Sequence, residues 1–200
     1  MWGLLDAFHG WSRSGIESQA APNGNWDCFV ENSPSIITPM KSADKIISWE
    51  QLPGWREKLR VQGRKLVVTN GCFDLLHRGH ATYLESARAL GDVLLVGVNN
   101  DASVRELKGP DRPVNSEADR AAVLAALQSV DAVCVFTDRT ALRFLSTVQP
   151  DIYAKGGDYT IDTINQEERR LIEKLGGKVA VLPGVPGQST TALLEKISRL

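Results

Sequence analysis

The sequence has little cysteine, no excess of charge of one sign and no long hydrophobic run. Its three cysteines, Cys28, Cys72 and Cys134, lie far apart, so no disulfide framework is expected and a reducing compartment is favoured. Lys and Arg number 23 against 24 Asp and Glu, which leaves no global field to attract nucleic acid or an anionic membrane. No stretch approaches the roughly 20 apolar residues that span a bilayer, and no basic region opens a secretory signal. We expect a cytoplasmic protein.

The composition predicts one packed domain and an additional segment. Hydrophobic residues make up 42% and charged residues 24% of the 200 residues, as in an average globular chain. Residues 1–47 show no sustained period of 2 or 3.6 and are interpreted as a largely irregular N-terminal extension. Because it holds Trp2, Trp11 and Trp26, we expect part of it to dock on the domain at 48–200 or on a second subunit of a homodimer.

From residue 65 onward, short apolar runs alternate with longer amphipathic ones, a pattern typical of β–α units around a parallel sheet. Strands are predicted at 65–69, 93–98, 132–136, 152–154 and 178–182, and helices at 48–61, 80–90, 102–107, 116–127, 141–147, 166–175 and 190–200. The leading helix has Ser48 as its candidate cap and Pro53 in its first turn. The predicted fold class is α/β, a Rossmann-like three-layer sandwich with a five-stranded parallel sheet.

The segment Thr69–His80 (TNGCFDLLHRGH) follows the first predicted strand and leads into an amphipathic helix. In an open parallel sheet, ligands bind beyond the carboxyl ends of the strands, and a helix N-terminus offers free N–H groups to a phosphate. Gly71 would let the backbone approach a nucleotide, and Gly79 would permit a tight entry into the helix. His77 and His80 flank that entry, so two imidazole donors would face one phosphate chain.

Other kinds of site fit this segment less well. A zinc site from Cys72, His77 and His80 lacks the i, i+4 spacing of helical metal pairs and a fourth ligand, so we expect no metal bound by the protein alone. The P-loop string that ends in Gly-Lys-Ser/Thr and a Gly-x-Gly-x-x-Gly after a strand are both missing, which disfavours kinases and dehydrogenases. His9 is interpreted as a solvated or capping residue.

The segment resembles the His-x-Gly-His nucleotidyltransferases, the superfamily of cytidylyltransferases and pantetheine-phosphate adenylyltransferase. Four motifs further along the chain are similar to the heptose 1-phosphate adenylyltransferases that make ADP-heptose: NNDASV at 99–104, LKGPDRPV at 107–114, KGGDY at 155–159 and STT at 189–191. The resemblance covers roughly residues 48 to 200. It implies the nucleotidyltransferase type of the predicted fold.

The resemblance also implies roles for individual residues. His77 and His80 would contact the triphosphate and stabilise charge as the α-phosphorus is attacked, while Lys108 and Arg120 match positions whose cations meet phosphates. The nucleotide pocket would include Gly71, Cys72, Phe73, Asp74, Gly79, Gly156, Gly157, Asp158, Ser189 and Thr190, and the substrate subsite Asn99, Asp101 and Arg112. The alternatives are solvated charges at Lys108, Arg120 and Arg112, caps at Ser189, Thr190 and Asp158, and packing at Cys72.

The reaction that the resemblance implies is transfer of AMP from ATP, with Mg²⁺ bound mainly through the phosphates, to heptose 1-phosphate. A separate protein would supply the sugar kinase. The alternatives are cytidylyl or adenylyl transfer to glycerol 3-phosphate, ethanolamine phosphate or FMN, and a catalytically silent nucleotide-binding subunit. Intact His77, His80 and Lys108 argue against the silent subunit.

Overall fold

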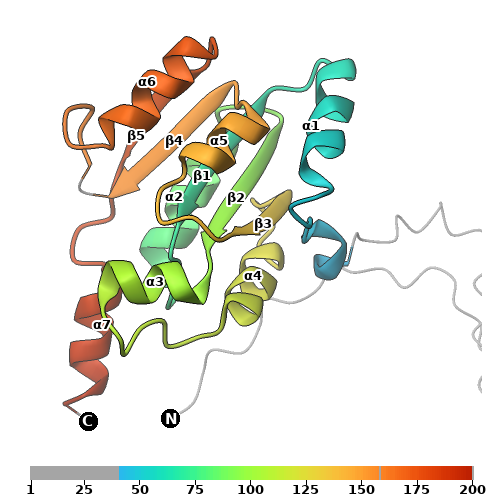
Figure 1. Cartoon of the computed structure of the whole chain (residues 1–200). Helices are drawn as coiled ribbons and strands as arrows, with labels where there is room; N and C mark the ends of the chain where they lie inside the picture. The colour runs from blue at the N-terminus through green and yellow to red at the C-terminus, as the bar shows by residue number, and fades with distance from the viewer. Residues whose placement is uncertain (1–40, 158, 200) are drawn as a thin grey trace, which may run out of the picture. The chain divides into compact units, whose positions relative to one another are not determined.

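The computed structural model describes residues 41–157 and 159–199, and Figure 1 shows a central sheet with helices in front of it and behind it. The sheet is five-stranded, with all neighbouring strands parallel and the order β3-β2-β1-β4-β5. The strands are β1 (Leu66–Gly71), β2 (Val93–Asn99), β3 (Ala132–Phe136), β4 (Ile152–Gly157) and β5 (Lys178–Pro183). The predicted α/β fold and its five parallel strands are confirmed.

Seven α-helices and one short 3₁₀ helix surround the sheet within the described residues. They are η1 (Ser42–Lys45), α1 (Leu52–Val61), α2 (Arg78–Arg88), α3 (Asp101–Lys108), α4 (Glu117–Ala125), α5 (Leu142–Val148), α6 (Gln166–Lys174) and α7 (Thr190–Ile197). Buried side chains of α1, α5 and α6 pack on one face of the sheet, and those of α2 and α4 pack on the other. This arrangement is the three-layer, doubly wound architecture that alternating β and α segments predict.

The strands lie in this sheet because both of their faces are apolar. On β1, Leu66 and Val68 face the layer of α1, α5 and α6, while Val67 faces the layer of α2 and α4. All seven residues of β2 are buried. Such continuous burial is typical of central parallel strands, and it explains why the sequence shows apolar runs there rather than alternation.

Two capping predictions have different outcomes. Ser116 caps α4 as predicted, since its Oγ accepts a hydrogen bond from the backbone N–H of Asp119 at 3.2 Å. The prediction of Ser48 as the cap of the leading helix is wrong: α1 begins at Leu52, and its N-cap position is Gln51. Ser48 instead lies in the preceding turn, where its Oγ donates to Glu50 at 2.8 Å.

The residues just before α1 contact the sheet. Ile46 forms a parallel bridge with Val133 of β3, and the N–H of Ile47 donates to the Val133 carbonyl at 2.8 Å. The ammonium of Lys45 donates to the carbonyls of Leu127 and Val130 at 3.1 and 2.8 Å. Contacts divide the chain into Met1–Pro39 and Met40–Leu200, so residues 41–47, grouped with the extension on sequence grounds, share the unit of the sheet.

Some sequence predictions fall on residues outside the described part of the chain. These are the irregular extension up to residue 40, with Trp2, Trp11, Trp26, His9 and Cys28, and the site residue Asp158. Within residues 41–157 and 159–199, none of the helices combines the length and the apolar character that crossing a bilayer requires.

Candidate active site

A cavity of about 790 Å³ opens at the carboxyl edge of the sheet. It lies where β1 and β4 are neighbours and the chain crossovers leave in opposite directions, the point at which open α/β sheets bind ligands. Of the predicted site residues, those that line it are Gly71, Cys72, Phe73, Asp74, His77, Gly79, His80, Asn99, Lys108, Arg112, Gly156, Gly157, Ser189 and Thr190. Arg120 and Asp101 do not line the cavity.

The two histidines form a stacked pair at the start of α2. His77 occupies the N-cap position in an extended conformation without a side-chain cap bond. Its ring lies 3.9 Å from that of His80, centroid to centroid, at an interplanar angle of 24°. The Phe73 ring lies 5.3 Å from the His80 ring and is tilted by 57° to it. The Nδ1 atoms of both histidines are buried without a hydrogen-bond partner, and both residues line the cavity.

Their surroundings favour the neutral form of both histidines. Burial lowers the pKa of His77, and burial together with the neighbouring His77 lowers the pKa of His80 to about 4. Two stacked imidazolium ions would repel each other, and a site with little water disfavours either charge. A neutral imidazole still carries one N–H donor. In this neutral form the pair can donate hydrogen bonds to phosphoryl oxygens.

The start of α7 lies beside the start of α2. A Cβ on Gly79 would come within 3.1 Å of the Gln188 Cβ and 3.0 Å of the His77 ring, so only glycine fits there without displacement. The Thr190 hydroxyl donates to the Leu75 carbonyl at 3.4 Å, and Ser189 caps α7 through its Oγ. Two helix N-termini thus meet at the cavity, and their free N–H groups and dipoles favour a phosphate chain.

The carboxyl end of β4 supplies glycines for close packing. A Cβ on Gly156 would lie 2.2 Å from the ring of Tyr83 on α2, and Gly157 has a φ of +89° that favours glycine. The Tyr83 hydroxyl in turn hydrogen-bonds Thr69 Oγ1 on β1 at 2.7 Å. Both glycines line the cavity, but the structural reason for Gly156 is the tyrosine ring that covers it.

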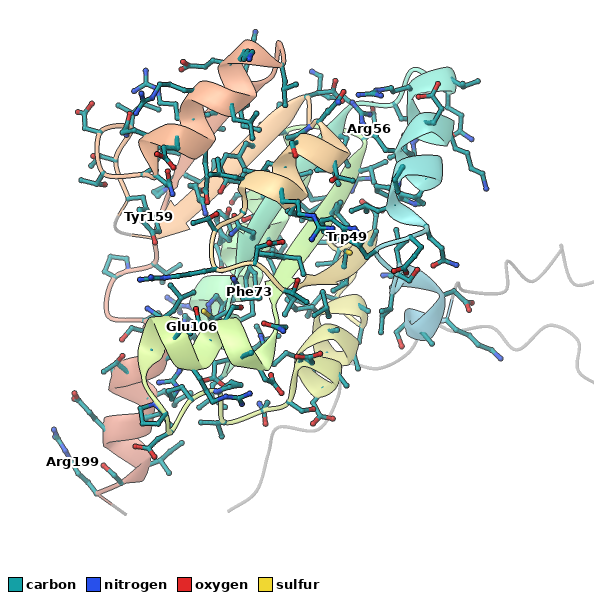
Figure 2. The ribbon with its side chains drawn as sticks, viewed as in Figure 1. Trp49, Arg56, Phe73, Glu106, Tyr159 and Arg199 are labelled. Atoms are coloured by element: carbon teal, nitrogen blue, oxygen red, sulfur yellow. The ribbon has the colours of Figure 1, made fainter. Side chains whose placement is uncertain are left out.

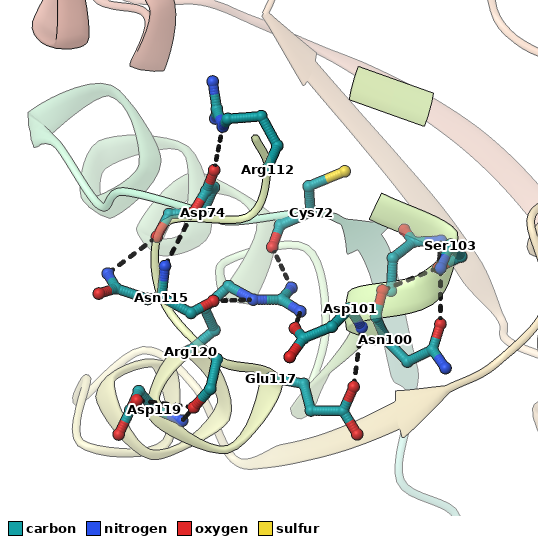
Figure 3. A network of polar contacts seen from close by, with 12 residues as sticks. Cys72, Asp74, Asn100, Asp101, Ser103, Arg112, Asn115, Glu117, Asp119 and Arg120 are labelled. Atoms are coloured by element: carbon teal, nitrogen blue, oxygen red, sulfur yellow. Dashed lines mark hydrogen bonds and ion pairs between the residues drawn. The ribbon is translucent and has the colours of Figure 1, made fainter. Parts of the chain in front are cut away.

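Asp74 organises the loop that leads from α3 to α4. Its carboxylate pairs with the Arg112 guanidinium and accepts the backbone N–H groups of Val114 and Asn115 at 2.7 and 3.3 Å. Figure 3 shows these contacts converging on one side chain, which is 3% exposed. Asp74 lines the cavity, and its carboxylate oxygens are already engaged by the protein. Its direct effect is to hold Arg112 at the cavity wall.

The guanidinium of Arg120 is directed into the protein. It donates to the Cys72 carbonyl, to the Asn115 carbonyl at 3.2 Å and to Asp101 Oδ1 at 2.7 Å (Figure 3). The residue is 2% exposed. The sequence-based assignment placed Arg120 on a phosphate and Asp101 at the substrate. The geometry instead pairs them with each other, where they tie α3 and α4 to the loop after β1.

Lys108 is the last residue of α3 and is exposed at the cavity. Within the described residues, its side chain makes no hydrogen bond or ion pair, so it is available to an anionic ligand.

Asn99, at the end of β2, is buried and donates from Nδ2 to Ser103 Oγ at 3.3 Å. Burial raises the pKa of the Cys72 thiol, and nearby Lys108 opposes that effect. A neutral thiol is a poor nucleophile, as expected for a packing residue.

Sequence reasoning missed two cations that line the cavity. They are Lys155, which lies on β4 within the motif at 155–159, and Arg139, which lies in the loop between β3 and α5. A signal for Lys155 did exist, because a lysine in an otherwise buried strand is rarely free of a partner. Figure 2 shows Phe73 near the centre of the structure and Tyr159, another lining residue, in the segment after β4.

The donors at the cavity do not form a protein-only metal site. No group of three or more His, Cys, Asp or Glu side chains that could hold an ion occurs among residues 41–157 and 159–199. Asp74 is the carboxylate within the described lining, and Arg112 and two backbone N–H groups occupy it.

Comparisons with known proteins identify the family of the chain. Residues 68–195 match the model of the cytidylyltransferase-like family. The chain is 49% identical to the bifunctional protein HldE of Methylobacillus flagellatus and 51% identical to that of Ectopseudomonas mendocina, over 78% and 76% of its length. It spans 32% of the length of each of these relatives.

A solved structure is also similar. A lipopolysaccharide core biosynthesis protein from Thermoplasma volcanium superposes with a TM-score of 0.52 at 31% sequence identity. The superposition covers 62% of this chain and 98% of the other.

Proposed function

The chain belongs to the cytidylyltransferase-like family, and we propose that it transfers AMP from ATP to heptose 1-phosphate, giving ADP-heptose and pyrophosphate. The observation that carries the proposal is the stacked, neutral pair of His77 and His80 at two converging helix N-termini. The motif similarity to ADP-heptose-forming enzymes supports the acceptor. So do the HldE relatives and the similarity to a protein named for lipopolysaccharide core biosynthesis.

The reaction needs positioning more than proton transfer. A phosphate monoester is already ionised at pH 7, so its oxygen can attack the α-phosphorus of ATP in line, without a general base. The cavity accordingly offers imidazoles, cations and helix N-termini. His77 and His80 would donate hydrogen bonds to oxygens whose charge grows in the transition state. Such preorganised donors are usually the largest contribution to catalysis of this kind.

The leaving pyrophosphate would remain bound where α2 and α7 begin. The free backbone N–H groups there and the Ser189 and Thr190 hydroxyls suit its charge, and Lys108 supplies a mobile ammonium at the rim. Mg²⁺ would enter as MgATP, because the described residues provide no cage of their own. A cytoplasmic location, a separate sugar kinase and a homodimer stay predictions.

The direct test is a matrix of nucleotides and acceptors. The protein is incubated with ATP or CTP together with heptose 1-phosphate, glycerol 3-phosphate, ethanolamine phosphate or FMN, and pyrophosphate release and product mass are measured. We expect turnover with ATP and heptose 1-phosphate to exceed that of every other pair. Equal kcat/KM for ATP and CTP would remove the adenylyl assignment. Failure of every pair to release pyrophosphate would favour the silent nucleotide-binding subunit.

A further inference from the structure

The cavity has two sides with different chemistry. On the side of α2 and α7 lie the histidine pair and the two helix N-termini, which suit a triphosphate. The opposite side is formed by the ends of β1 and β4 and by the segments that lead into α5 and α6. Lys155 and Arg139 line the cavity there. The function proposed above leaves these two cations without a role.

Lys155 is a buried cation with hydrogen-bonding capacity left over. Its side chain is 13% exposed, and its Nζ donates to Asn70 Oδ1 on β1 at 2.8 Å. Glu168 Oε2 lies 3.8 Å from the same Nζ, close enough for an ion pair but too far for a hydrogen bond. An ammonium has three N–H donors. Asn70 is the hydrogen-bond acceptor that this Nζ contacts within the described residues, and the rings of Tyr153 and Tyr159 lie 4.9 and 5.9 Å from it. Its other N–H groups can therefore turn to a ligand in the cavity.

Glu168 is itself fully occupied by other groups. One oxygen accepts the backbone N–H of Ala141 at 3.0 Å, and the other lies 2.6 Å from the Tyr153 hydroxyl. The carboxylate therefore supplies a buried counter-charge and fixes the start of α5 against α6, while it leaves the donors of Lys155 open. Burial lowers the pKa of Lys155, and Glu168 opposes that effect.

In-line geometry determines which ligand oxygen reaches this side. The attacking oxygen approaches the α-phosphorus opposite the leaving pyrophosphate. If the pyrophosphate lies at the starts of α2 and α7, an acceptor phosphate held on the side of α5 and α6 would approach the α-phosphorus from the opposite side. Arg139 adds a second cation there from the loop after β3, and its side chain forms no ion pair within the described residues. A dianionic phosphate needs such charge compensation in a partly desolvated cavity.

We propose, on the basis of the proposed function, that Lys155 binds the phosphate of the sugar 1-phosphate acceptor through its free N–H donors, with Glu168 as the residue that positions it. Lys155 thereby holds the attacking phosphate in line with ATP. Glu168 touches no substrate and acts through the lysine. The inference assigns the acceptor phosphate, rather than the triphosphate, to Lys155.

The test separates the two substrates kinetically. Lys155→Met should lower kcat/KM for the sugar 1-phosphate roughly 10- to 100-fold, the size expected for a lost charged hydrogen bond, with the KM for ATP changed less than threefold. Lys155→Arg should recover part of the loss, and Glu168→Gln should raise the sugar-phosphate KM by less than Lys155→Met does. Lys174→Met, which removes an exposed lysine from α6, is the matched control and should behave as wild type.

Folding is controlled by a second variant. Lys155→Met leaves the Glu168 carboxylate buried without its counter-ion, whereas Lys155→Met with Glu168→Gln removes both charges together. The double variant should fold, bind ATP as wild type does in equilibrium dialysis, and still show the sugar-phosphate defect. A rise in the KM for ATP as large as that for the sugar phosphate would overturn the inference, and so would wild-type kinetics for both substrates.

A binding experiment distinguishes failure of this inference from failure of the proposed function. Calorimetry with the non-reactive α,β-methylene ATP present measures the affinity for heptose 1-phosphate, glucose 1-phosphate and glycerol 3-phosphate, whether or not turnover occurs. If the wild type releases no pyrophosphate but binds one of these esters, the proposed function fails. Weaker binding of that ester by Lys155→Met would then still support the inference. If the wild type binds none of them, the inference fails as well.

Discussion

Two groups of charged residues lie close together at the carboxyl edge of the sheet, and they differ in where their hydrogen-bonding capacity is used. In the loop network of Asp74, Asp101, Arg112 and Arg120, the groups bond mainly to one another and to the backbone. In the cavity set of His77, His80, Lys108 and Lys155, donors or acceptors remain open. Charged and polar residues therefore stabilise the loops around the cavity in the first group, and they are available to a ligand in the second.

This difference predicts whether a mutation lowers stability or activity first. Loss of a residue from the loop network leaves buried partners unpaired, so stability should fall first. Loss of His77, His80 or Lys108 from the cavity set leaves the protein's own bonds intact, so activity should fall first. The predictions below test that separation, in order of decreasing expected effect.

The largest effect is expected for Arg120→Met. The change removes a buried guanidinium and leaves Asp101 Oδ1 and the carbonyls of Cys72 and Asn115 without their donor. Breaking a buried pair of this kind costs about 3–5 kcal/mol in the free energy of unfolding, measurable by urea denaturation. Arg105→Met, an exposed position on α3, should be nearly neutral. Unchanged stability with lost turnover would instead give Arg120 the direct catalytic role that its position in the family motif suggested.

The opposite pattern is expected for His77→Ala and His80→Ala. Removing a preorganised donor to a developing oxyanion costs about 2.7–4 kcal/mol of barrier, or roughly 10²–10³ in kcat, while the protein loses no side-chain hydrogen bond at the two unpartnered Nδ1 atoms. Pyrophosphate release and the urea midpoint are measured together. Glu85→Ala, exposed on α2, is the control. Turnover within threefold of wild type for both variants would contradict this role.

The sequence predicts one of these groups better than the other. His77, His80 and the glycines around them lie within one short segment, so their spacing and the following helix pattern were enough to identify them. The loop network and the contacts of Lys155 join residues far apart in the chain, such as Asn70 with Lys155 and Lys155 with Glu168. Neither the periodicity of the sequence nor the spacing within a motif shows which distant residues come into contact. For the same reason, the motif assigned Arg120 to a phosphate, whereas in the structure its guanidinium donates to Asp101 and to backbone carbonyls.

Strand positions were predictable because apolar β-branched runs are local, but strand ends were less so. β4 was predicted to end at residue 154 and extends to Gly157. Its last three residues, Lys155, Gly156 and Gly157, line the cavity, and their composition alone would predict a turn. The start of the folded unit was similarly obscured, because Ile46 and Ile47 join β3 only through contacts distant in sequence.

Two truncations of different length test whether Lys45, like the loop network, contributes to stability through bonds within the protein. Deletion of residues 1–40 should leave an active domain with nearly unchanged melting temperature. Deletion of residues 1–47 also removes the two hydrogen bonds of Lys45 and the Ile47 side chain, which is 8% exposed. Burial of such a side chain contributes about 1.5–3 kcal/mol, so the longer deletion should lower the melting temperature by several degrees. Equal melting temperatures for the two deletions would place the start of the domain after residue 47.

The smallest effect concerns the charge state of the cavity set. Burial lowers the pKa of His80 to about 4, whereas a histidine in an unfolded chain titrates near pH 6.5, as a general reference. Between these values the unfolded chain binds more protons than the folded one, so the contribution to stability is complete above about pH 6.5 and falls as the pH drops toward about 4. Urea unfolding from about pH 7.5 to about pH 4.5 should therefore show a shallower loss of stability for His80→Gln than for wild type, since glutamine cannot titrate. Parallel curves would mean that His80 is already solvated, and the two stacked imidazoles would then act as an ordinary surface pair.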